Sequence, residues 1–198
     1  MKDLVFATNN QHKIQEVKLI IGKTFQIISL SDIGCTDEII EDANTLEGNA
    51  LIKSRFVFQK FGYNCFADDT GLEISALHGN PGVFSARYAG EPPDFEANID
   101  KVLREMSDIS DRNARFRTVI SLILGEKEYF FEGFIKGNIL NHRRGNNGFG
   151  YDSIFVPSGY NKTFAEMKNE EKASISHRYI ALSELMKFLN SVDTSGII

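Results

Sequence analysis

Two adjacent carboxylates in FADDTGLEI, residues 66–74, are the first candidates for chemistry in this sequence. In an extended chain, successive side chains point to opposite faces, so we expect Asp68 and Asp69 to have different roles. One carboxylate can accept backbone N–H bonds in a turn through Thr70 and Gly71, which is a purely structural role. The other can face a cleft and bind Mg²⁺, which prefers oxygen ligands; Glu41 is a second candidate ligand, and simple solvation is its alternative.

A polar loop, TNNQHK at residues 8–13, separates a short apolar strand from a helical pattern. The start of a helix presents N–H groups and the positive end of the helix dipole, and anions bind there readily. Thr8 and Asn10 add side-chain donors, and Lys13 adds a positive charge. The loop can therefore hold a phosphate chain, although it lacks the glycines of a P-loop and an ordinary polar turn is the alternative.

Aromatic and cationic residues form a second set of candidates. In NNGFGYD, residues 146–152, glycines on both sides of Phe149 let the backbone approach a flat ligand while the ring stacks on it; the alternative is a turn with a buried Phe. EEKASISHR places Lys172 just before a helix and His177 and Arg178 in its first turn. The helix dipole makes positive charges unfavourable at the start of a helix, so we expect an acidic or acceptor-rich ligand to stabilise these cations.

The segment GNPGVFSARYAG, residues 79–90, contains Ser85 and Arg87 between glycines and aromatic residues. We interpret it as a packed loop in which Arg87 forms a structural ion pair.

Hydrophobic periodicity indicates which elements position these residues. We expect a strand at 4–8, a helix through Ile21 ending at Gly22, and a helix from a capping pair, Asn44 and Glu47, to Phe61. We further expect strands at 65–67 and 72–77, followed by a turn at HGNPG and a helix capped by Asp94. The rest of the chain predicts a hairpin of 114–124 with 128–135, a capping box at Thr163 and Glu166, and a final helix after Ser176. This order predicts an α/β chain with a mixed sheet and flanking helices, in a single domain over 1–198.

Composition and net charge indicate which partners and which cellular compartment to expect. A net charge of -5 and a pI near 5.4 argue against nucleic-acid binding through overall charge. Two cysteines in a chain of this size favour free thiols in a reducing compartment over a disulfide framework. Because the first residues do not have the pattern of a signal peptide and no apolar run reaches the length of a membrane span, we expect a cytoplasmic protein with no membrane partner.

The ordered series TNNQHK, EGNALIKS, FADDTGL, GNPGVFSARYAG, GFGYD and EEKASISHR resembles the motifs of the inosine/xanthosine triphosphate pyrophosphatase family. The resemblance extends over nearly the whole chain, and six motifs in the family's order are highly specific. It implies an elongated mixed sheet with flanking helices, two lobes around a central active-site cleft, and a homodimer.

The resemblance also implies Mg²⁺-dependent hydrolysis of the nucleoside triphosphates ITP, dITP or XTP to the monophosphate and pyrophosphate. Asp69 would be the catalytic base and, with Glu41, a metal ligand. The substrate would contact Thr8, Asn9, Asn10, Gln11, His12, Lys13, Lys53, Thr70, Phe149, Gly150, Tyr151, Asp152, Lys172, His177 and Arg178. Asp68 would support the turn, and Ser85 and Arg87 would lie at the cleft.

One departure from the family pattern is Ser153, where proline commonly follows GFGYD; a proline fixes φ, so its loss loosens one backbone position of the base pocket. Two other functions are compatible with the residues themselves. The first is a pyrophosphatase for pyrimidine triphosphates, which would differ only in its base pocket. The second is a nucleotide-binding regulator that has lost catalysis.

Overall fold

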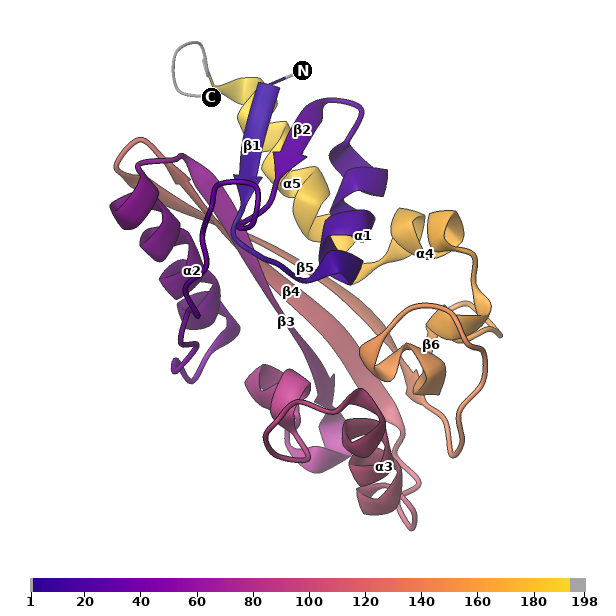
Figure 1. Cartoon of the computed structure of the whole chain (residues 1–198). Coiled ribbons are helices and arrows are strands. Elements are labelled where there is room, and N and C mark those ends of the chain that lie inside the picture. Colours follow the sequence, from indigo (N-terminus) through magenta and orange to yellow (C-terminus); the bar gives the residue numbers. More distant parts are fainter. Residues whose placement is uncertain (1, 193–198) are drawn as a thin grey trace. The chain divides into compact units, whose positions relative to one another are not determined.

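The computed structural model describes residues 2–192 (Figure 1). The helices are α1 (Gln11–Ile21), α2 (Leu46–Phe61), α3 (Phe95–Glu105), α4 (Asn169–Ile175) and α5 (His177–Ser191). The strands are β1 (Lys2–Phe6), β2 (Phe25–Ile28), β3 (Cys65–Ile74), β4 (Asn113–Leu124), β5 (Lys127–Ile139) and β6 (Phe155–Pro157). Their order in the sheet is β2-β1-β3-β4-β5-β6, with β1 parallel to β2 and β3, and β5 antiparallel to β6. The predicted mixed sheet with flanking helices is confirmed.

The chain divides into two compact units. The first comprises the described parts of 1–69, 118–133 and 178–198, and the second comprises 70–117 and 134–177. Strands β3, β4 and β5 contribute residues to both units. The expectation of a single domain with an active-site cleft between two lobes stays a prediction.

The core of the first unit follows from the alternation of side chains along β1. Leu4 and Phe6 belong to one buried cluster, which includes the apolar faces of α1 and α5. Val5 and Ala7 belong to another, which includes Val57 of α2. Because successive strand residues point to opposite faces, α1 and α5 pack on one side of this part of the sheet and α2 packs on the other.

Strand β3 differs from the prediction. The expected strands at 65–67 and 72–77 are one continuous strand, Cys65–Ile74, so the expected turn that Asp68 would support is absent. Gly71 lies inside this strand, where an added Cβ would lie 2.5 Å from the carbonyl oxygen of Gly82. The glycine therefore marks the close approach of another backbone segment and not a turn.

The ends of the helices confirm some predictions and correct others. Asp94 caps α3 as expected, whereas α2 is capped by the side chain of Thr45 and not by Asn44. Thr163 and Glu166 form the predicted capping box, on a short 3₁₀ turn. Lys172 lies within α4, a separate short helix, and not before a helix start.

The hairpin of β4 and β5 is confirmed, with both strands longer than predicted. The short strands β2 and β6 were not predicted. Both have few residues, so neither shows enough period-two alternation for recognition from the sequence.

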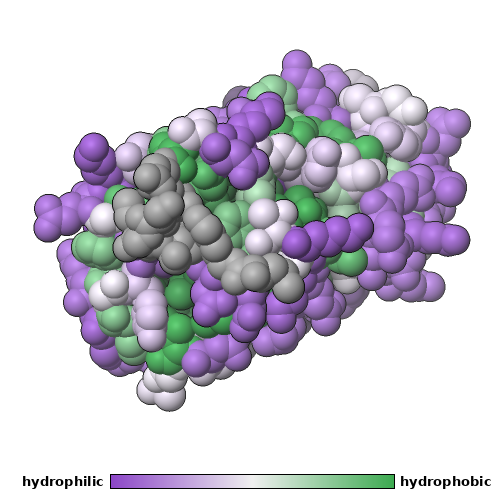
Figure 2. Space-filling model, turned by 90° about the horizontal axis from the view of Figure 1, so that it is seen from above, coloured by the Kyte–Doolittle hydropathy of each residue, from purple (hydrophilic) through white to green (hydrophobic). Residues whose placement is uncertain are grey.

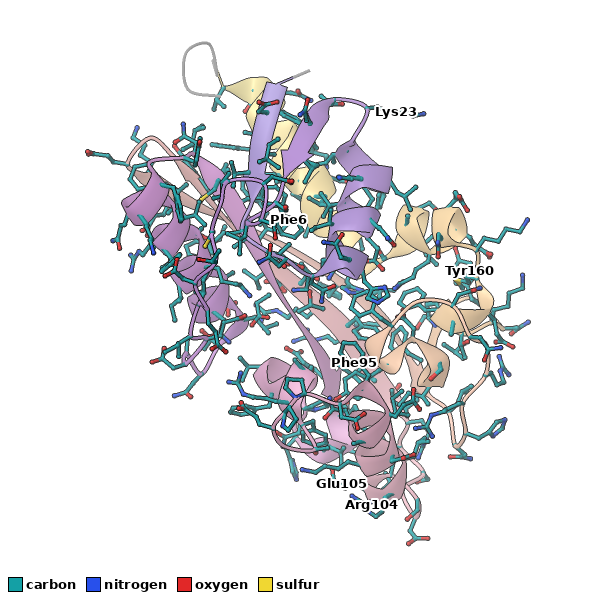
Figure 3. All side chains as sticks on the ribbon, viewed as in Figure 1. Phe6, Lys23, Phe95, Arg104, Glu105 and Tyr160 are labelled. Atoms are coloured by element: carbon teal, nitrogen blue, oxygen red, sulfur yellow. The ribbon has the colours of Figure 1, made fainter. Side chains whose placement is uncertain are left out.

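The core of the second unit surrounds the inner face of α3. Ile99 and Val102 pack in a buried cluster with Leu72 of β3 and Phe116 of β4. Figure 3 shows Arg104 and Glu105 at one end of α3 and Phe95 toward the other.

Figure 2 shows a mostly hydrophilic surface, interrupted by hydrophobic patches. Along residues 2–192, none of the helices combines the length and the apolar character that a membrane span requires.

Candidate active site

Asp69 lies on the α2 side of β3, where two carboxylates meet one buried lysine. The Nζ atom of Lys53 is 2.5 Å from Oε2 of Glu41 and 3.8 Å from Oδ1 of Asp69. The other carboxylate oxygen of Asp69 accepts a hydrogen bond from Nδ2 of Asn49 at 3.2 Å. Asn49 and Lys53 are one helical turn apart, so both side chains leave the same face of α2. Glu41 comes from the loop before this helix.

Burial and neighbouring charges have opposite effects on the pKa values of Lys53 and Asp69. Burial alone would lower the pKa of Lys53, but the negative charges of Asp69 and Glu41 outweigh burial and raise it. Burial raises the pKa of Asp69, and the positive charges of Lys53 and Lys13 only partly oppose that rise. Lys53 therefore stays protonated, while Asp69 is a more basic carboxylate than an exposed one.

Asp68 lies on the opposite side of β3, as strand alternation predicted. Its Oδ1 atom accepts a bond from Nζ of Lys13 at 2.9 Å, and its Oδ2 atom accepts from Nε of Arg178 at 3.1 Å. Arg178 also donates to Oε2 of Glu16, which lies on α1. Lys13, on the same helix, and Arg178, on α5, thus hold Asp68 from two helices.

The pKa of Asp68 follows from these contacts. Burial alone would raise the pKa, but the charges of Lys13 and Arg178 outweigh burial and hold it far below its ordinary value. Burial alone would lower the pKa of Arg178, but Glu16 and Asp68 raise it. Asp68 is therefore a fixed negative charge, which cannot act as a proton acceptor near neutral pH.

The loop before α1 forms more hydrogen bonds with other groups of the protein than the sequence indicated. The side chain of Asn10 accepts bonds from the backbone N–H groups of His12 and Lys13, so these two groups are not free for a ligand. Oγ1 of Thr8 accepts from the N–H of Asn10, and Oδ1 of Asn9 accepts from Ser31. These oxygens act as acceptors within the loop, while the hydroxyl hydrogen of Thr8 and the side-chain NH₂ of Asn10 can still donate, so their role toward a ligand stays a prediction.

Gln11 and His12, also expected to contact substrate, lie at the exposed start of α1. Lys13 has its side chain largely buried against Asp68.

The second unit contains a different cluster, formed by Phe149, Asp152 and Lys172. Oδ2 of Asp152 accepts bonds from Nζ of Lys172 at 2.6 Å and from the backbone N–H of Phe149 at 2.9 Å. The same ammonium group lies 5.0 Å from the centre of the Phe149 ring. Gly148, at a φ of 77°, places its Cα hydrogen against Asp152, where a Cβ would collide with the carboxylate. The glycine before Phe149 is therefore required by the ion pair.

The second unit also contains the base-pocket candidates Tyr151, His177 and Gly150. Tyr151 is buried, and its hydroxyl donates to the carbonyl oxygen of Ser85 at 2.9 Å. His177 is also buried and stacks on Phe116, with ring centres 4.8 Å apart. Gly150, at a φ of 57°, begins the turn that carries Tyr151.

Ser85 is a structural residue in this unit. Its Oγ atom accepts from the N–H of Leu72 at 2.9 Å and donates to the carbonyl oxygen of Gly82 at 2.6 Å. Arg87 lies 3.9 Å from the carboxylate of Glu91, consistent with the predicted ion pair. Thr70 follows Asp69 on β3 and is half-buried.

The structure therefore divides the candidates into two sets. Those of the first unit are Thr8, Asn9, Asn10, Gln11, His12, Lys13, Glu41, Lys53, Asp69 and Arg178, and those of the second are Thr70, Phe149, Gly150, Tyr151, Asp152, Lys172 and His177. Arg178, which the sequence grouped with His177 and Lys172, belongs by its contacts to the Asp68 cluster.

Sequence reasoning missed two residues of these clusters, Glu16 and Asn49. Glu16 is three residues after Lys13, on a helix whose buried face is otherwise apolar. Asn49 is four residues before Lys53 on the buried face of α2. Polar residues repeated at helical spacing on a buried face are the signal that would have found Asn49.

A divalent cation fits the donors on the α2 side of β3. Glu41 and Asp69 present carboxylate oxygens at one place, and Mg²⁺ is bound in enzymes by one or two carboxylates together with water and substrate phosphates. Within 2–192, the side chains form no larger group of three or more histidines, cysteines or acids that could hold a metal. A metal held by these two carboxylates would complete its coordination with water or with phosphate oxygens of a substrate.

Similarity to known proteins extends over nearly the whole chain. The model of the Ham1 family matches residues 4–188. A dITP/XTP pyrophosphatase of Flavobacterium psychrophilum is 54% identical over 188 residues, which are 95% of this chain and 99% of the relative. The structure of the Staphylococcus aureus Ham1 protein matches with a TM-score of 0.86 and 40% identity, covering 96% of this chain and 98% of that one. A HAM1 protein from Coxiella burnetii matches with a TM-score of 0.87 and 37% identity, covering 97% and 100%.

Proposed function

Because this chain belongs to the Ham1 family, we propose that it hydrolyses dITP, XTP and ITP to the nucleoside monophosphate and pyrophosphate. The observation that carries this proposal is the convergence of Glu41 and Asp69 on Lys53. Two carboxylates at one buried ammonium group supply metal ligands, a proton acceptor and a phosphate-binding cation in one place.

In the proposed reaction, water attacks phosphorus at the α,β linkage, and Asp69 accepts the proton that the water loses. The new P–O bond forms as the bond to the pyrophosphate leaving group breaks. Lys53 and Lys13 stabilise the negative charge that develops on the phosphate oxygens. The raised pKa of Asp69 supports its role, since a more basic carboxylate is a better proton acceptor.

We propose Mg²⁺ as the cofactor, held by Glu41 and Asp69. The chemistry that Mg²⁺ supplies when bound is neutralisation of the phosphate charge, which makes phosphorus easier to attack. Asn49 orients Asp69 through its side-chain amide, and so keeps one carboxylate oxygen directed away from Lys53.

The purine base is assigned to the cluster of the second unit. The ring of Phe149 stacks on the base, and Lys172 and His177 supply donors to the 6-oxo group that hypoxanthine and xanthine share. Adenine presents an amino group at the same position, so its donor would face another donor, and such a mismatch costs orders of magnitude in selectivity. Arg178 is the remaining candidate for this role.

We further propose that the enzyme acts on the nucleotide pool of the cytoplasm as a homodimer. The support is the family membership.

The test is to incubate the purified protein with dITP, ITP, XTP, GTP, ATP and UTP, with Mg²⁺ or with a chelator, and to quantify pyrophosphate and orthophosphate separately. Mg²⁺-dependent pyrophosphate release confined mainly to dITP, ITP and XTP is the expected result. Faster turnover of UTP would favour a pyrimidine pyrophosphatase. Binding of dITP without turnover would favour a nucleotide-binding regulator.

A further inference from the structure

Phe95 is an aromatic residue beside the Phe149 cluster that none of the sequence motifs contains. It is the first residue of α3, and 41% of its surface is exposed. Phe95, Ile99 and Val102 follow the i, i+4, i+7 spacing of one helix face. Ile99 and Val102 lie in the core of the second unit, whereas Phe95 continues the same stripe beyond the core (Figure 3).

Phe95 contacts Phe149 at the point where this stripe leaves the core. The two ring centres are 6.2 Å apart and the ring planes are inclined by 52°. This geometry is in the range of tilted aromatic pairs, which attract each other beyond the apolar area that they bury. Rings this close and this tilted do not admit a base between them.

The two rings therefore form one aromatic surface. Phe149 is half-buried and Phe95 is exposed, so both keep area that a ligand can cover. Single exposed apolar residues are common on proteins, whereas ligand sites are typically lined by aromatic side chains with a few polar groups, as here, where the two rings lie beside a buried ion pair. The buried ammonium group of Lys172, which is paired with Asp152, lies 5.0 Å from the centre of the Phe149 ring.

We propose that Phe95 is a specificity residue for the substrate base. The base stacks on Phe149 and extends to Phe95, and a purine, with two fused rings, covers Phe95 more fully than a pyrimidine does. This inference rests on the proposed function, since it assigns a residue to the base of the same substrate. Its consequence is that part of the preference for purines comes from apolar contact and not from hydrogen bonding.

The experiment compares Phe95→Ala with Phe95→Leu and with a matched control, Phe134→Ala. Phe134 is 43% exposed, lies in the same unit and is in none of the site clusters. For each variant, kcat and KM are measured with dITP, and the binding of dIMP and dCMP is measured by calorimetry. Thermal melting checks that each variant folds.

We expect Phe95→Ala to raise KM about five-fold or more with kcat nearly unchanged, as for the loss of a stacking contact. The affinity for dIMP falls more than that for dCMP, Phe95→Leu lies between Phe95→Ala and the unaltered protein, and Phe134→Ala has no effect. Equal KM values for Phe95→Ala and Phe134→Ala would overturn the inference, as would an equal loss for dIMP and dCMP. Failure of the unaltered protein to hydrolyse dITP would instead count against the proposed function.

Discussion

The charged residues around Asp68 and Asp69 in the first unit and the cluster of Phe149, Asp152 and Lys172 in the second unit use similar ion pairs in different surroundings. In the first, Asp68 pairs with Lys13 of α1 and Arg178 of α5, and on the other side of β3 Asp69 lies beside Lys53 of α2. In the second, one carboxylate, Asp152, pairs with one ammonium group, Lys172, beside aromatic rings. Several cations around adjacent carboxylates suit a polyanionic phosphate chain, and an isolated ion pair beside aromatic rings suits a flat, nearly neutral base. The comparison predicts that substitution of Asp69 acts mainly on chemistry and that substitution of Asp152 acts mainly on stability.

The largest expected effect is on catalysis by the first cluster. Asp69→Asn removes the proposed proton acceptor but keeps the size of the side chain, so kcat for dITP should fall about 10²- to 10⁴-fold. The control is Asp37→Asn, which changes an exposed carboxylate paired with Lys60 in the same unit. Pyrophosphate release measures the rate, and thermal melting measures folding. A rate for Asp69→Asn close to that of the control would contradict the assignment of the base.

The second effect is on stability in the aromatic cluster. Asp152→Ala leaves the buried ammonium group of Lys172 without its carboxylate, and breaking a buried ion pair costs about 3–5 kcal/mol. Asp100→Ala removes one exposed partner of Arg143, and such surface pairs contribute about 0–1 kcal/mol. Urea unfolding of both variants measures the difference. Adding Lys172→Met to Asp152→Ala should restore part of the loss; similar free energies of unfolding for the two single variants would contradict the comparison.

A smaller effect should follow from the scaffold of the second unit. Ser85→Ala leaves the buried N–H of Leu72 without its acceptor, and a buried unpaired donor costs about 1–3 kcal/mol. Ser85→Thr keeps a hydroxyl at this position and should recover most of the stability. Ser174→Ala is the control, because that hydroxyl is exposed and bonds within its own helix. Equal melting temperatures for Ser85→Ala and Ser174→Ala would show that the Leu72 bond is not needed.

The smallest effect is a change in how stability depends on pH. Bonds from the backbone of Thr163 and from Arg144 lower the pKa of Glu166 in the folded protein. A lowered folded-state pKa contributes stability that is present above the unfolded-state pKa and is lost as the pH falls through the folded-state value. Glu166→Gln should therefore lower the melting temperature slightly at pH 7 and progressively less toward pH 3. A difference that grows as the pH falls would contradict this sign.

Local patterns predicted most of the fold and part of the site. Helical spacing located α2 and α5, and strand alternation placed Asp68 and Asp69 on opposite faces. What the patterns did not provide was distant contact. Gly71 was interpreted as part of a turn, but the structure explains this glycine by the close approach of the Gly82 backbone. That approach is a tertiary contact, which the local sequence does not indicate. Arg178 follows His177 directly, yet its contacts with Asp68 and Glu16 are with residues more than a hundred positions away.

The caps show the same limit at shorter range. The side-chain oxygen of Asn10, which was expected only to add a donor for a ligand, caps its own helix by accepting two backbone bonds. Asn44 and Glu47 have the spacing of a capping pair, yet Thr45 forms the cap. Neighbouring residues of similar chemistry compete for one position, and sequence spacing does not decide between them.

The alternation of β3 makes a change of length in this strand affect more of the site than a change of residue type does. A substitution at Asp68 or Asp69 alters one cluster and leaves the other its residues. An insertion or deletion of one codon upstream in the strand would turn every following side chain to the opposite face, and would exchange the partners of both carboxylates at once. Along this strand, descendants of the chain are therefore expected to differ in residue type but not in length.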